Sequence, residues 1–147
     1  MCYMVVLSTD SPVDLSAEND RLIVFSRELP SGVDADQLAY PNRWFVGSAH
    51  GCSCGFRHLY VSSIELGLAE PVDWFPEEPD DVEATRTFVA TVRRLVEQGA
   101  RVDCVDAWEH GDSRALSGIV DIDLAQVSDA QFRFFENHRF VFHSTSR

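Results

Sequence analysis

Short apolar segments rich in β-branched and aromatic residues recur along the chain, and this pattern predicts β-strands. The segments are residues 3–7, 22–25, 44–46, 57–61, 102–108, 119–124 and 140–143. Proline, glycine and aspartate between residues 30 and 36 are typical of a loop that joins the second and third strands. The pattern therefore predicts a protein built largely from short strands.

One long helical periodicity follows residue 79. Asp80, with Glu83 three positions later, is typical of a capping box, and acidic residues in a first turn complement the helix dipole. Gly99 is a natural C-terminal stop. The residues that recur at spacings of three and four are Val82, Thr85, Phe88, Val89, Val92, Leu95 and Val96. We therefore predict an amphipathic helix over about 80–98.

The order of these elements predicts an α+β fold, because strands and helices do not alternate as they do in a doubly wound protein. We expect a largely antiparallel or mixed β-sheet of about five to seven strands, with the long amphipathic helix packed on one face. A short C-terminal helix is expected over 129–135, with Ser128 as its N-cap and Asn137 at its end. No repeat or linker divides the chain, so we expect one globular domain over 1–147.

The composition adds limits on partners and compartment. A formal net charge of -12 repels phosphate backbones and anionic lipids, so we expect no nucleic-acid and no membrane partner. The basic residues are all arginine, and the lack of lysine excludes Schiff-base chemistry and a P-loop. No signal peptide and no run of about 18 apolar residues is visible, so we expect a cytoplasmic protein with reduced thiols.

The segment His50-Gly51-Cys52-Ser53-Cys54-Gly55 is the densest group of chemically active residues in the sequence. Zinc is bound by thiolate sulfur and neutral imidazole nitrogen, usually with four ligands in a structural site. We therefore expect a zinc-like metal site, with Cys104 as a further source of a ligand. Its predicted ligands are His50, Cys52, Cys54, His58 and Cys2.

Strand geometry limits how this segment can bind a metal. Residues two apart on an extended strand lie about 6.5 Å from each other, whereas sulfur atoms on one zinc ion lie about 3.8 Å apart. A positive φ at Gly51 or Gly55 would let the chain curl and bring the two sulfur atoms together. The hypothesis therefore requires a bent loop and a further ligand from elsewhere in the fold.

Other interpretations of the cysteine segment stay open. Arg57 and the neighbouring histidines would stabilise a thiolate, which favours a reactive thiol or a strained Cys52–Cys54 disulfide. The two cysteines are also small apolar residues that pack well in a tight turn. Ser53 matches the G-x-S-x-G pattern of a nucleophile elbow, and removal of Met1 would give Cys2 the free amine of an N-terminal nucleophile.

An acidic and aromatic stretch over 70–83 suggests a different class of function. It carries seven acidic residues and no basic residue. The negative electrostatic field of such a stretch attracts a basic protein partner. The alternative to a metal or thiol site is therefore an acidic binding or inhibitory module without catalytic activity. The predicted partner surface consists of Trp74, Glu77, Glu78, Asp80 and Asp81. The sequence assigns no catalytic residue, no organic cofactor and no oligomeric state.

Overall fold

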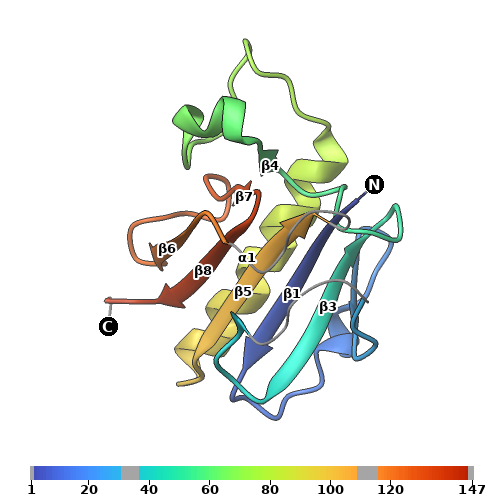
Figure 1. Ribbon diagram of the computed structural model, residues 1–147. Coiled ribbons are helices and arrows are strands. Elements are labelled where there is room, and N and C mark those ends of the chain that lie inside the picture. Colours follow the sequence, from blue (N-terminus) through green and yellow to red (C-terminus); the bar gives the residue numbers. More distant parts are fainter. Residues whose placement is uncertain (1, 31–36, 109–115, 146–147) are drawn as a thin grey trace.

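A six-stranded mixed sheet forms the centre of the protein (Figure 1). The computed structural model describes residues 2–30, 37–108 and 116–145. In spatial order the strands are β2 (Ile23–Ser26), β3 (Asn42–Ser48), β1 (Tyr3–Thr9), β5 (Val102–Trp108), β8 (His138–His143) and β6 (Gly118–Asp123). All neighbours are antiparallel except β6 and β8, which are parallel. The α+β class and the mixed sheet predicted from the sequence are confirmed.

The long helix α1 (Pro79–Glu97) packs across one face of the sheet (Figure 1). The centre of its apolar stripe, Phe88, Val89 and Val92, is fully buried against aromatic and aliphatic side chains of the sheet. Glu78 is the N-cap and makes no side-chain cap hydrogen bond, so the predicted capping box is wrong. Pro79 starts the helix instead, because its fixed φ suits the first helical position and its missing N–H would have no partner there.

The predicted C-terminal helix over 129–135 is not found. Gln131 N–H donates to the Ser128 carbonyl oxygen at 3.1 Å, which closes a single turn, and the chain then extends into β7 (Phe134–Phe135). The reason is burial on both sides of the chain, because Phe132, Arg133 and Phe134 are all 0% exposed. An extended backbone sends the phenylalanines into the core and Arg133 to the other side, which a helix would not do.

The predicted strand over 57–61 is reduced to β4 (His58–Leu59), which pairs in parallel with β7. The chain turns at Tyr60, whose backbone N–H donates to the Ser63 hydroxyl at 3.0 Å, and the 3-10 helix η3 (Val61–Leu66) follows. A second 3-10 helix, η1 (Leu15–Glu18), precedes β2. The other predicted strands are confirmed within a few residues. Among the described residues, no helix has the length and apolar character that a membrane span needs.

Candidate metal centre and the adjoining cavity

Three cysteine side chains meet at one end of the sheet. Cys2 directly precedes β1, while Cys52 and Cys54 lie in the loop between β3 and β4. The three Sγ atoms all lie within 4.8 Å of one another. Figure 1 shows the N-terminus and this loop at the same edge of the sheet. The sequence therefore supplies the cluster from two segments that are about fifty residues apart, and β1–β3 pairing brings them together.

The loop curls because of Ser48 and two glycines. Ser48 N–H donates to the Cys52 carbonyl oxygen at 2.7 Å, and Gly51 has a φ of +82°, which favours glycine. The Ser48 hydroxyl also donates to that oxygen at 2.7 Å and accepts the Gly55 N–H at 3.0 Å. A Cβ at Gly55 would lie 2.6 Å from this hydroxyl, so only glycine fits. The bend expected at the glycines is present.

Ser53 anchors the loop to the sheet. It is 0% exposed, and its hydroxyl donates to the Val46 carbonyl oxygen at 2.6 Å while it accepts the Val5 N–H at 2.8 Å. Val5 and Val46 are register partners on β1 and β3, so the hydroxyl bridges the two strands. A strand-bridging hydroxyl with no helix directly after it does not form a nucleophile elbow, which rules out that interpretation.

The protonation of the three thiols is uneven. Burial disfavours a thiolate at Cys52, but hydrogen bonds from the backbone N–H of Cys54 and from the thiols of Cys54 and Cys2 lower its pKa. Burial and the neighbouring Cys52 raise the pKa of Cys54 to about 12, although the Tyr3 N–H donates to its Sγ at 3.3 Å. The hydrogen bond to Cys52 likewise raises the pKa of Cys2. The cluster therefore favours one thiolate, at Cys52, held by two thiols.

The predicted histidine ligands do not join this group. His50 is exposed at the surface of the loop. Neither His50 nor His58 contributes a ring nitrogen to the group of ligand atoms that lie within 4.8 Å of one another. Both ring nitrogens of His58 already have partners: Nδ1 donates to the Phe56 carbonyl oxygen at 2.9 Å, and Nε2 lies 3.2 Å from the Asp106 carboxylate. Cys104 is fully buried in the sheet, outside the cluster.

Arg57 does not act on the thiols, because all of its donors are used elsewhere. Its Nε and one Nη2 hydrogen donate to the two oxygens of Glu77, at 2.7 and 2.9 Å. The other three N–H groups donate to backbone carbonyl oxygens of Ala69, Ala130 and Phe132. A guanidinium has five N–H donors, so none is left for a sulfur atom. Arg133 Nη2 also lies 3.1 Å from Glu77 Oε1, so Arg57, Glu77 and Arg133 form a small buried ionic cluster.

The pair of His58 and Asp106 was not predicted from the sequence. Asp106 lies on β5 and is 0% exposed, and Tyr3 stacks on the His58 ring with 4.3 Å between centroids. Burial disfavours the imidazolium, but the Asp106 carboxylate outweighs that effect and raises the pKa of His58. The available signal was the presence of aspartates inside a largely apolar strand, Asp103 and Asp106, since a buried charge requires a partner.

A cavity of about 480 Å³ adjoins the cysteine cluster. Cys54, His58 and the aromatic rings of Tyr3 and Tyr60 line it, together with acidic residues at the start of α1. Cys54 belongs to both the cavity wall and the sulfur cluster, so the cluster opens into the cavity through this residue. A small molecule that enters the cavity would therefore contact Cys54, the residue of the cluster that lines its wall.

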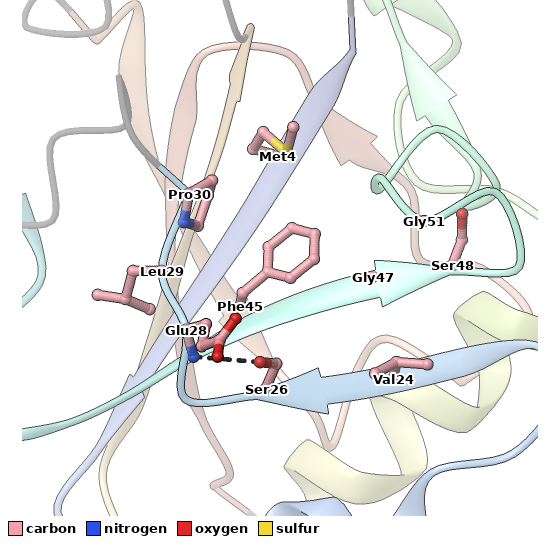
Figure 2. Close-up of a pocket in the computed structure, with 10 residues that line it drawn as sticks. All are labelled: Met4, Val24, Ser26, Glu28, Leu29, Pro30, Phe45, Gly47, Ser48 and Gly51. Carbon is pink, nitrogen blue, oxygen red and sulfur yellow. Dashed lines mark hydrogen bonds between the residues drawn. The ribbon is translucent and has the colours of Figure 1, made fainter.

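A second hollow, of about 430 Å³, lies on the sheet face opposite α1 (Figure 2). Met4 and Phe45 point into it from β1 and β3, and Leu29 and Pro30 close one side. Gly51 lies at its margin, so the cysteine loop separates the two hollows. Glu28 is the only titratable residue among its described lining residues, so this hollow offers one carboxylate and no cluster of groups for metal or acid–base chemistry.

Comparisons of the chain with protein-family models, with curated proteins and with solved structures gave no match. The function must therefore be inferred from the chemistry of the site itself.

Proposed function

We propose that the protein binds a soft metal ion, with zinc as the first candidate, through the sulfur atoms of Cys2, Cys52 and Cys54. The proposal depends on one observation, the approach of three free thiols within 4.8 Å at the end of a rigid sheet. Thiolates are the preferred ligands of zinc and of other soft ions. Buried cysteines pack singly in most cores, so three sulfur atoms in mutual contact point to coordination.

The distances need only a small adjustment to hold an ion. Sulfur atoms bound to one zinc ion at about 2.3 Å lie about 3.8 Å apart, so no separation within the cluster must close by more than about 1 Å. Rotation about side-chain torsions provides this movement without a change in the backbone. The Cys52 thiolate provides the first ligand, and the ion then displaces the protons of Cys2 and Cys54.

Three protein ligands leave the fourth position of a tetrahedral ion open. Structural zinc sites have four protein ligands, whereas sites with three keep a position for water or another molecule. In this proposal the open position faces the cavity, because Cys54 lies on its wall. The site is therefore proposed as one that exchanges a ligand.

Metal titration tests the proposal. Co²⁺ added to the reduced, metal-free protein should bind at one ion per chain and give the intense near-ultraviolet absorption of thiolate-to-cobalt charge transfer, which zinc should then remove. Cys54→Ser should weaken the affinity by at least about 100-fold, because one of three ligands is lost. Cys104→Ala is the matched control, since Cys104 is buried outside the cluster, and should bind as the wild type does.

Two results would contradict the proposal. One is a stoichiometry far below one ion per chain under reducing conditions. The other is an equal loss of affinity in Cys54→Ser and Cys104→Ala, which would show that the cluster is not the binding site.

One observation supports the second candidate function, an acidic surface for a basic protein partner. Trp74 is 73% exposed, and Glu78 and Asp80, which follow it by four and six residues in the sequence, are exposed as well. Glu77 is not part of such a surface, because it is buried between two arginines. If this surface binds a basic partner, Trp74→Ala should weaken capture of that partner by at least about tenfold in solution, while Val24→Ala should not. Equal capture by both variants would exclude the surface.

A further inference from the structure

The charged and aromatic groups around the 480 Å³ cavity distinguish between ligands of opposite charge. The arginine on its wall, Arg57, has donated every N–H group to Glu77 and to carbonyl oxygens. An anion in the cavity would therefore find no free guanidinium donor there. The helix N-terminus beside the cavity also offers little to an anion, because Asp80 and Asp81 already complement its dipole.

A cation in the cavity, in contrast, would lie near carboxylates that have no hydrogen-bond or ion-pair partner among the described residues. Glu78 and Asp81 line the cavity, and within the described residues neither side chain has a hydrogen bond or an ion pair. Burial, with the nearby Glu78, raises the pKa of Asp81, while the field of His50 opposes this. A positive charge in the cavity would relieve that repulsion.

Aromatic rings complete the wall. Tyr3, Tyr60 and Phe75 line the cavity, and ring faces attract an ammonium group. If the cavity were roughly spherical, its diameter would be about 10 Å, so each wall carboxylate would lie within about one Debye length of the Cys54 sulfur at 0.1 M salt. A ligand of four to six heavy atoms, as an order of magnitude, would span the distance from carboxylate to sulfur.

We propose that this cavity binds a small aminothiol, with the ammonium group at Glu78 and Asp81 and the sulfur at the cysteine cluster. The inference deepens the proposed function, because the ligand's sulfur would occupy the open position of the metal ion. Its charge selectivity is a property of the cavity alone and exists in the metal-free protein as well.

Two thiol-specific reagents with the same reactive group and opposite charge test this selectivity. They are 2-aminoethyl and 2-sulfonatoethyl methanethiosulfonate, used on the reduced, metal-free protein. A cysteine thiolate attacks the sulfenyl sulfur, a mixed disulfide forms, and methanesulfinate leaves with the electron pair of the broken S–S bond. The measured quantity is the ratio of the two rate constants, which cancels the intrinsic reactivity of the thiol in each variant.

The ratio should favour the cationic reagent in the wild type and should fall by about tenfold in the double variant Glu78→Gln/Asp81→Asn at 0.1 M salt. The matched control is Asp80→Asn/Glu83→Gln, which changes the net charge equally at exposed positions outside the cavity wall. Its ratio should stay within about twofold of the wild type. Peptide mapping should find the label on Cys52 or Cys54.

An equal fall in both double variants would overturn the inference, because only the overall charge would then matter. An unchanged ratio in Glu78→Gln/Asp81→Asn, or label confined to Cys104, would overturn it as well. Since these rates are measured without metal, failure of the metal titration and failure of the charge selectivity are separate results.

Discussion

Two polar clusters border the same cavity, and they differ in how fully their groups are satisfied. The ionic cluster of Arg57, Glu77 and Arg133 is buried, and every donor of Arg57 has an acceptor within 3.1 Å. The cysteine cluster contains weak donors and acceptors that mainly contact one another. Arg57 therefore has no donor left for a ligand, and the one donor of this cluster without a partner among the described residues, Arg133 Nε, is buried. The cysteine cluster, in contrast, has three sulfur atoms ready for a ligand.

The difference shows why charge density in a sequence is a poor guide to a reactive site. Arg57 follows Cys54 by three residues and looks like a thiol activator, yet the fold directs it to Glu77. A buried guanidinium must be paired because its desolvation is costly, and that requirement decides its role. Sulfur carries no such requirement, so the cysteines remain available.

The largest expected effect comes from breaking the ionic cluster. Glu77→Gln would leave two buried guanidinium groups without a counter-charge and should lower the free energy of unfolding by about 3–5 kcal/mol. Asp80→Asn, which breaks the exposed pair of Arg21 and Asp80, should change the free energy of unfolding far less, because water and salt screen an exposed ion pair. Denaturant unfolding of both variants measures the difference. Similar losses in the two variants would mean that the buried cluster does not hold the fold.

The pH dependence of metal affinity is the next largest effect. The pKa of Cys2 is raised and that of Cys54 is about 12, so both thiols are protonated at neutral pH and must release protons to bind an ion. The release of these two protons alone makes the affinity increase by at least about 100-fold per pH unit between about pH 6 and pH 8. Competition with a chelator at several pH values measures this. A nearly constant affinity would exclude the two cysteines as ligands.

A smaller effect is expected at the pair of His58 and Asp106. The pKa of His58 is raised in the folded protein, so its stabilisation is complete below the unfolded value of about 6.5 and is lost as pH rises through the folded pKa. Asp106→Asn removes the carboxylate, and burial should then lower the pKa of His58. The gap in unfolding free energy between wild type and variant should therefore widen as pH falls from about 8 to about 6, by at most about 1.4 kcal/mol per unit. Denaturant unfolding across this range measures the gap, and parallel curves would contradict the assignment.

Most of the sheet and the long helix could be predicted from the sequence, because elements with a buried face carry apolar residues at a regular spacing along the chain. The strand over 102–108 and the helix over about 80–98 follow from such spacings. The expected helix over 129–135 is wrong because Arg133 alternates with phenylalanines, and its partner Glu77 is far away in the sequence. Local pattern carries no information about that pairing.

The candidate site could be predicted only in part. Cys52 and Cys54, and the bend at Gly51, follow from residue types and from strand geometry. Cys2 was also among the predicted ligands, but its approach to Cys52 and Cys54 depends on the register of β1 against β3, which the sequence does not specify. His58 was expected as a ligand because it is near the cysteines in sequence, but Asp106 on β5 engages its Nε2.

X-ray absorption spectroscopy of the zinc-loaded protein tests the central claim most directly, because it counts the sulfur atoms bound to the ion. Three sulfur scatterers at about 2.3 Å and one lighter atom are expected, and Cys54→Ser should reduce the sulfur count to two. A first shell made of nitrogen and oxygen atoms, or a sulfur count that does not change in Cys54→Ser, would contradict the assignment of Cys2, Cys52 and Cys54 as the metal site.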